Sequence, residues 1–235
     1  MERKVALVTS SAKGIGKALI IELAKNNYDV IITYNKSKDE AFNLDKYIKD
    51  NFSVNSMIIK CDITNEKDII NMKNKVLERY KHLDLLINNA AYAQDNYIFD
   101  KTKEEFMKVL EVNVVGTFLV IKYLYDLIEN GIIINISSTD AVDTYSEMNI
   151  DYSASKAAVN SITKTFDLVF PNIKVIGVMP NWTNTEAIKE MNQDYLNTEL
   201  KRIGQDRLEE PEEVAQNIIN LLEDEKVKSG DIRRV

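Results

Sequence analysis

Cysteine and histidine are almost absent from this sequence of 235 residues, which contains only Cys61 and His82 of these two types. A single cysteine cannot form an intramolecular disulfide, so we expect a reducing compartment and a cytoplasmic protein. A single histidine gives no histidine cluster, and we therefore predict no metal site. A histidine-based catalytic triad could use only His82, which argues against most hydrolytic chemistry.

Long apolar runs, linkers and an excess of positive charge are also missing. No apolar run approaches the roughly 20 residues that span a bilayer, and the first residues do not fit a secretory signal. With 3 Pro, 7 Gly and no Pro/Gly/Ser-rich stretch, we predict one domain over residues 1–235. The 30 Lys and Arg against 37 Asp and Glu give a net charge of −7, which argues against nucleic-acid and membrane partners.

Short apolar runs alternate with longer amphipathic segments along the chain. The short runs predict strands at 5–9, 30–34, 57–59, 83–87, 132–136, 175–178 and 231–235. The longer segments predict helices over 14–26, 38–50, 65–81 (capped by Thr64), 103–129, 152–169, 185–203 and 211–223. Strands that are apolar on both faces and alternate with helices form parallel sheets.

This pattern predicts an α/β fold. We expect a single-domain, Rossmann-like, doubly wound parallel β-sheet of about seven strands, with helices on both faces. Ligands of such folds bind at the carboxyl ends of the strands, so function is expected in the turns that follow them.

The turn after the first predicted strand, Thr9-Ser10-Ser11-Ala12-Lys13-Gly14-Ile15-Gly16, has two closely spaced glycines. Glycine lets a backbone approach a phosphate, and the N–H groups at a helix start favour an anion. A plain glycine turn would explain the same residues, but its place in the first βα turn favours a nucleotide. The G-x-G-x-x-G pattern does not fit, because Ala18 and Leu19 follow Gly16.

Tyr152 and Lys156 are four residues apart, so both side chains can reach one site from a single helix face. Three of the 11 tyrosines have a lysine at this spacing, but only Tyr152 begins a helix after a strand that ends in Ser137-Ser138. Asn113 lies among apolar residues in the preceding helix and needs a buried partner. A capping serine, a surface ion pair and a core amide would explain each feature alone; their order and spacing favour one catalytic set.

Four motifs together resemble the short-chain dehydrogenase/reductase family. They are the turn at 9–16, Asn-Asn-Ala-Ala at 88–91, Tyr-x-x-x-Lys at 152–156 and Pro-Asn-x-x-x-Thr at 180–185. Three glycines of the family pattern are replaced, by Ser10, Ala91 and Asn181. The segments 135–140 and 150–156 look most like the 3-oxoacyl-[acyl-carrier-protein] reductase branch.

The resemblance fits the chemistry of carbonyl reduction. Hydride that reaches a carbonyl carbon creates an alkoxide, and a phenol can protonate it; we assign Tyr152 as this general acid/base. Lys156 lowers the pKa of the phenol and holds the nicotinamide ribose. Ser138, with Ser137 as the alternative, donates a hydrogen bond to the substrate oxygen. The family resemblance alone implies that Asn113 holds a water that relays protons.

The end of the second predicted strand has no acidic residue to accept the 2′-hydroxyl of an adenosine ribose. Lys13 and the segment 35–38 offer cationic and hydroxyl groups instead, so NADP(H) is preferred over NAD(H), unless these lysines are merely solvated. Asp62 resembles the family acid that binds the adenine amino group. The predicted cofactor-binding residues are Thr9, Ser10, Ser11, Lys13, Gly14, Ile15, Gly16, Tyr34, Asn35, Lys36, Ser37, Cys61, Asp62, Ile63, Asn89, Ala90, Ala91, Tyr152, Lys156, Pro180, Asn181, Trp182, Thr183 and Thr185.

The sequence therefore predicts an NADP(H)-dependent oxidoreductase acting on a carbonyl or secondary alcohol. The substrate is a small molecule, either a 3-oxoacyl thioester or another small ketone. The segment at about 184–205 is expected to be a mobile lid over it, and simple packing of these helices onto the domain is the alternative. We also expect a homo-oligomer, a dimer or tetramer. The alternative is a nucleotide-binding sensor or regulator without turnover, which the replaced glycines favour; a Rossmann-like methyltransferase would leave Tyr152 and Lys156 without a purpose.

Overall fold

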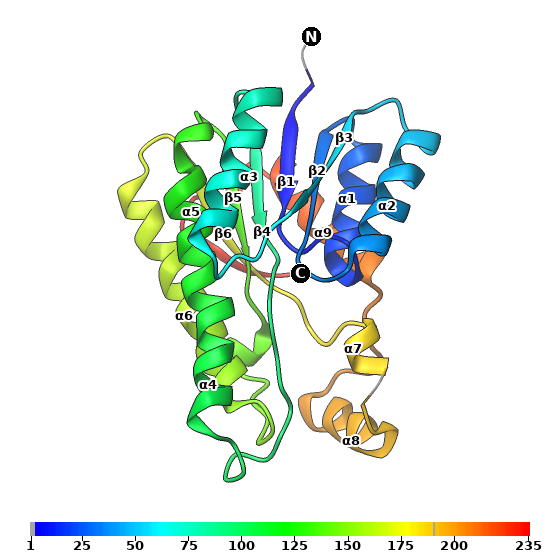
Figure 1. Cartoon of the computed structure of the whole chain (residues 1–235). Coiled ribbons are helices and arrows are strands. Elements are labelled where there is room, and N and C mark those ends of the chain that lie inside the picture. Colours follow the sequence, from blue (N-terminus) through cyan, green and yellow to red (C-terminus); the bar gives the residue numbers. More distant parts are fainter. Residues whose placement is uncertain (1–2, 190) are drawn as a thin grey trace.

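Parallel strands form the centre of the computed structural model, which describes residues 3–189 and 191–235. The described residues contain a seven-stranded sheet with the order β3-β2-β1-β4-β5-β6-β7, in which every pair is parallel (Figure 1). The strands are β1 Val5–Val8, β2 Asp29–Tyr34, β3 Ser56–Lys60, β4 Leu85–Asn88, β5 Ile132–Ile136, β6 Lys174–Met179 and β7 Ile232–Arg234. The predicted doubly wound α/β fold is confirmed.

Helices cover both faces of the sheet (Figure 1). They are α1 Gly14–Lys25, α2 Lys38–Asn51, α3 Glu66–Arg79, α4 Lys103–Leu110, α5 Thr117–Leu124, α6 Ile150–Val169, α7 Glu186–Lys189, α8 Gln193–Ile203 and α9 Pro211–Glu223. Among the described helices, none is both long and apolar enough to cross a membrane.

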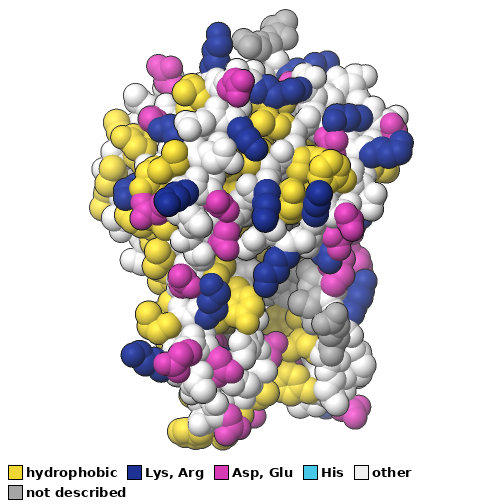
Figure 2. Space-filling view, in the orientation of Figure 1, with side chains coloured by type: hydrophobic (Ala, Val, Ile, Leu, Met, Phe, Trp, Pro, Cys, Tyr) yellow, Lys and Arg dark blue, Asp and Glu magenta, His cyan; other side chains and the backbone are white. Residues whose placement is uncertain are grey.

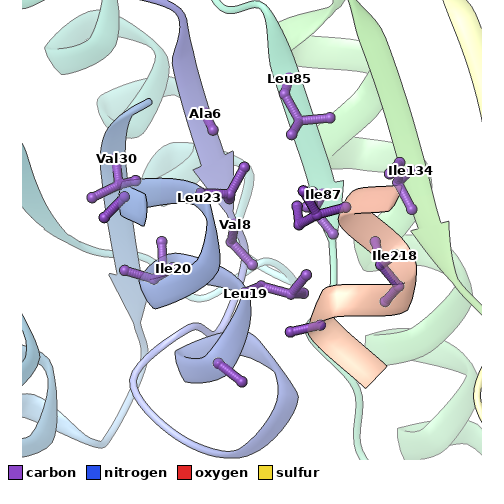
Figure 3. Close-up of a cluster of buried hydrophobic side chains, with 14 of the residues drawn as sticks. Ala6, Val8, Leu19, Ile20, Leu23, Val30, Leu85, Ile87, Ile134 and Ile218 are labelled. Carbon is purple, nitrogen blue, oxygen red and sulfur yellow. The ribbon is translucent and has the colours of Figure 1, made fainter. Parts of the chain in front are cut away.

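Strand β1 shows how the sheet is buried on both faces. Ala6 and Val8 pack against α1 and α9, where Leu19 and Ile218 complete a dry cluster (Figure 3). Val5 and Leu7 point to the opposite core, which α3 and α5 cover. Because successive strand residues face opposite sides, a fully apolar strand fits only between two layers of helices.

Three predicted helices differ from the structure. The predicted helix 103–129 is interrupted by a π-helical segment, Glu111–Gly116, and α5 ends at Leu124 before a short 3₁₀ turn. The predicted helix 185–203 is divided into α7 and α8, and residue 190 lies outside the described residues. The cap of α3 is Asn65 rather than Thr64, because the Asn65 side chain accepts from the Lys67 N–H at 3.0 Å.

A buried ion pair fixes the start of α6. Lys101 Nζ lies 3.0 Å from Asp151 Oδ2, and both side chains are almost fully buried. Lys101 also donates to the Gln94 carbonyl at 2.6 Å and to Asn96 Oδ1 at 2.7 Å, while Asp151 Oδ1 accepts from the Tyr152 N–H at 2.9 Å. The pair therefore ties the loop after β4 to the first turn of α6.

Lys101→Met should lower the free energy of unfolding by about 3 kcal/mol, because it leaves the Asp151 carboxylate buried and unpaired. Chemical denaturation measures this loss. Lys46→Met, which removes an exposed ion pair with Asp50, should leave the unfolding midpoint nearly unchanged. Asp151→Asn added to Lys101→Met should restore part of the stability; equal losses in the Lys101 and Lys46 variants would contradict the role of the buried pair.

Candidate functional site

A cleft of about 460 Å³ lies at the carboxyl ends of β1, β4, β5 and β6. The sheet order reverses between β1 and β4, so the turns that follow these two strands diverge and leave room for a ligand. The predicted residues that line the cleft are Ser10, Lys13, Gly14, Ile15, Gly16, Asn89, Ala91, Ser138, Tyr152, Lys156, Pro180, Asn181, Trp182, Thr183 and Thr185.

The turn after β1 forms one end of the cleft. Ser10 has a φ of 53°, in the left-handed region, so it adopts a conformation that glycine reaches without strain. Its N–H donates to Thr33 Oγ1 at 2.9 Å, which holds this conformation in place. Gly16 permits close packing, since a Cβ there would lie 2.6 Å from Asn89 Nδ2 and 2.7 Å from the Ser10 carbonyl oxygen.

The start of α1 fits a phosphate group. Lys13, at its N-cap, makes no side-chain capping bond, and the first turn contains no acidic residue. The first N–H groups of a helix have no intrahelical partner, and the helix dipole favours negative charge at this end. The pyrophosphate of a dinucleotide therefore suits this position.

Asn89 joins the turns after β1 and β4. Its Nδ2 donates to the carbonyls of Thr9 at 3.0 Å and Ser10 at 3.1 Å. In return, Thr9 Oγ1 accepts from the N–H groups of Asn89 and Ala90, both at 2.9 Å. Thr9 and Ala90 thus hold the two turns together by hydrogen bonds and do not themselves line the cleft.

Tyr152 and Lys156, both on α6, line the cleft. Lys156 Nζ donates to the Ile136 carbonyl at 2.7 Å and lies 5.4 Å from the centroid of the Tyr152 ring. Burial lowers the pKa of Lys156 to about 8, and the carboxylate of Asp140 opposes that shift. Burial and Asp140 raise the pKa of Tyr152, and a hydrogen bond with Ser138 opposes them.

The two serines after β5 have different partners. Ser137 Oγ donates to the Lys156 carbonyl at 3.0 Å, so its proton is used in holding α6 to the strand. Ser138 Oγ accepts from the Asp140 N–H at 3.1 Å and shares a hydrogen bond with Tyr152. Of the two, Ser138 is the hydroxyl that bonds to Tyr152.

Asn113 lies in the π-helical segment and outside the residues that line the cleft. Its Nδ2 donates to the Tyr92 carbonyl and to Ser155 Oγ, both at 2.9 Å, and its Oδ1 accepts from the Tyr92 N–H at 2.7 Å. Ser155 Oγ donates in turn to the Tyr152 carbonyl at 2.7 Å. The amide therefore supports α6 directly, and its role in holding a water stays a prediction.

The predicted adenosine residues Tyr34, Asn35, Lys36, Ser37, Cys61, Asp62 and Ile63 lie beside the cleft rather than in its lining. Asn35 Nδ2 donates to Asp62 Oδ2 at 2.9 Å, which joins the ends of β2 and β3. Burial raises the pKa of Asp62, but hydrogen bonds from Thr64 and Asn35 outweigh burial and lower this pKa below its ordinary value. The buried thiol of Cys61 has its pKa raised to about 12, chiefly by burial.

Asp140 is the main site residue that the sequence analysis did not identify. Its carboxylate is 3% exposed and accepts from Asn149 Nδ2 at 3.0 Å, from the Trp182 indole N–H at 3.4 Å and from the Thr144 hydroxyl. Burial raises its pKa despite these bonds. Its position two residues after Ser138 is the feature of the sequence that could have identified it. Ser137, the alternative catalytic serine of the prediction, also lines the cleft. Further lining residues that were not predicted as cofactor or catalytic residues are Ala93, Asp95, Ile136, Asn149, Glu186, Ile188 and Met191.

The segment predicted as a lid contacts the far end of the cleft. The Tyr195 hydroxyl of α8 lies 2.7 Å from Ser146 Oγ, and Arg202 donates to the Tyr145 carbonyl. Gln205 Nε2 donates to the Trp182 carbonyl at 2.8 Å. These bonds join α8 to the loop between β5 and α6 and to the turn after β6.

Comparison with known proteins shows the family of this chain. The family model for short chain dehydrogenases matches residues 4–196. The 3-oxoacyl-[acyl-carrier-protein] reductase FabG of Thermotoga maritima is 33% identical over 96% of this chain and 92% of that protein. Glucose 1-dehydrogenase 2 of Bacillus subtilis is 30% identical over 90% of this chain and 84% of that protein.

Two solved structures have nearly the same fold. A dehydrogenase/reductase from Sinorhizobium meliloti has a TM-score of 0.91 at 26% identity and covers 100% of this chain and 94% of that one. A short chain dehydrogenase from Burkholderia cenocepacia in complex with NADP has a TM-score of 0.90 at 25% identity and covers 99% and 96%. With the family model matching most of its length, this chain is a member of the short-chain dehydrogenase/reductase family, most like its FabG-type oxidoreductases.

Proposed function

We propose that this oxidoreductase is an NADP(H)-dependent reductase that acts in the cytoplasm. Its proposed substrate is a 3-oxoacyl thioester or another small ketone. The observation that carries the proposal is the meeting of Ser138 and Tyr152 beside the buried Lys156 in one cleft. The similarity to FabG proteins supports the thioester. The missing acid at the end of β2 and the NADP complex of a structural neighbour support the choice of cofactor.

The chain's own residues hold the carbonyl and supply the proton. NADPH, when bound, supplies the hydride. Ser138 donates a hydrogen bond to the carbonyl oxygen, where negative charge develops. Tyr152 gives its phenolic proton to that oxygen, and its raised pKa keeps it in the acid form needed for reduction. Lys156 places a positive charge beside the phenolate that results.

We propose a homo-oligomer in which α5 and α6 form a subunit contact. Phe118 and Phe166 are stacked at 6.3 Å, and Phe166 and Phe170 at 5.2 Å, across the outer face of these helices. Phe118 is 43% exposed, and Figure 2 shows hydrophobic side chains gathered at the edge where α5 and α6 lie. A second copy would remove this surface from water.

A nucleotide-binding sensor without turnover is the competing function, because Ser10 takes a left-handed φ where the family has glycine. NADPH oxidation with a carbonyl panel that includes an acetoacetyl thioester separates the two. We expect turnover, with a lower KM for NADPH than for NADH. Micromolar NADPH binding without turnover of any carbonyl would favour the sensor.

Tyr152→Phe should lower kcat about 100- to 10,000-fold while NADPH binding stays nearly unchanged, because only the proton donor is lost. Ser138→Ala should lower kcat about 100-fold or more. Ser137→Ala serves as the matched serine and should mainly cost about 1 kcal/mol of stability, through its bond to α6. Steady-state kinetics and denaturation measure these effects; a larger kinetic loss for Ser137 than for Ser138 would reverse their assignment.

The kcat/KM for reduction should fall as pH rises through about 8, because Lys156 loses its charge there. Asp140 raises the pKa of Lys156, so Asp140→Asn should move this falling limb about half a unit or more to lower pH. Two further charged residues act on neighbouring groups: Asp95 raises the pKa of Tyr152, and Arg202 lowers the pKa of Asp140. Asp143→Asn, an exposed acid of the same loop, should leave the limb in place. An unmoved limb in Asp140→Asn contradicts the coupling.

A further inference from the structure

Lys13 is engaged by an acidic residue at the adenosine end of the site. Its Nζ lies 2.7 Å from Glu40 Oε1, and both side chains are partly exposed. Lys13 is in the turn after β1, and Glu40 is in the first turn of α2, directly after β2. In dinucleotide-binding folds the adenosine ribose lies between these two turns. The ion pair therefore spans the place where a 2′-phosphate would lie.

Two other polar side chains at this end have contacts of their own. Asn35 uses its amide to bond Asp62, and Lys38 Nζ lies 5.7 Å from the centroid of the Phe42 ring. Lys36, at the end of β2, is exposed. Among the described acids of this end, Glu40 is the one with an ion pair to Lys13, and the hydrogen bond from Lys13 lowers the pKa of Glu40, so it is ionised at neutral pH.

A 2′-phosphate and the Glu40 carboxylate would compete for one ammonium group. Binding of NADPH must break or share the ion pair and place a dianion near a carboxylate. NADH has a hydroxyl at this position and leaves the pair intact. We propose that Glu40 determines cofactor specificity in this protein: it acts as an internal competitor for the 2′-phosphate and limits the preference for NADP(H). This inference rests on the cofactor preference proposed above.

Four proteins test the competition by fluorescence titration with NADPH and NADH. They are the unaltered chain and the three single variants Glu40→Gln, Asp39→Asn and Lys13→Gln. A fifth protein combines Glu40→Gln with Lys13→Gln. Asp39 is the matched control, because it is an exposed acid of the same helical turn. Adenosine 2′,5′-bisphosphate and AMP serve as probes of the 2′-phosphate alone.

Glu40→Gln should tighten NADPH and adenosine 2′,5′-bisphosphate about three- to tenfold and change NADH and AMP by less than about twofold. Asp39→Asn should have a clearly smaller effect, and the gain should shrink when Lys13 is also replaced. Unchanged or weaker NADPH binding in Glu40→Gln would overturn the inference. Equal tightening of NADH, or an equal gain in Asp39→Asn, would overturn it as well, because each would indicate a general effect of charge or structure.

Failure of the cofactor proposal is a separate result. If the unaltered chain binds NADH more tightly than NADPH, the proposed preference is wrong. The change in the NADH-to-NADPH ratio on Glu40→Gln still tests the competitor role in that case, because the ratio compares the two cofactors within each variant.

Discussion

The burial of the Lys156 ammonium group is the constraint on which the site depends. A buried charge is costly unless polar groups surround it, and here Lys156 Nζ donates to the Ile136 carbonyl at the end of β5. The backbone carbonyl of Lys156 accepts from Ser137 in the opposite direction. Two hydrogen bonds thus join the end of β5 to Lys156 of α6. Ser138 follows directly after Ser137 and shares a hydrogen bond with Tyr152. The same burial lowers the pKa of Lys156, and the carboxylate of Asp140 opposes this loss of charge.

Helix α6, which carries the proposed catalytic residues Tyr152 and Lys156, is supported by contacts from separate parts of the chain. The π-helical segment brings Asn113 to Ser155, and the loop after β4 brings Lys101 to Asp151. Both contacts fall within two turns of Tyr152. A π-helical segment adds a residue to a helical turn and is common at functional sites. Here it places a buried amide where the regular helix predicted from the sequence would have placed a different side chain.

The fold could be predicted from the sequence because apolar runs of strand length alternate with helical patterns throughout. The site was harder to predict, for physical reasons that differ by residue. Tyr152 and Lys156 have a spacing that a helix converts into proximity. Asp140 has no such spacing, and its network exists only once Trp182 and Asn149 are folded around it. The pairing of Lys13 with Glu40 joins two turns that only the parallel sheet brings together. The interrupted helix could not be predicted, because its apolar periodicity continues through Asn113.

The two ends of the cleft differ in charge, and this limits what can bind. The end at α1 has unpaired helical N–H groups and Lys13, which favour the phosphates of a dinucleotide. The other end has Asp95 and Asp140, whose pKa values are raised by desolvation, and Asp140 contributes to the shift of Asp95. A carboxylate beside a substrate carbonyl would add further negative charge to this acidic end. Since repulsion between like charges grows as water is excluded, the arrangement favours substrates that are neutral around the carbonyl. The ketones and thioesters proposed as substrates are neutral there, whereas free 3-oxo acids carry a carboxylate.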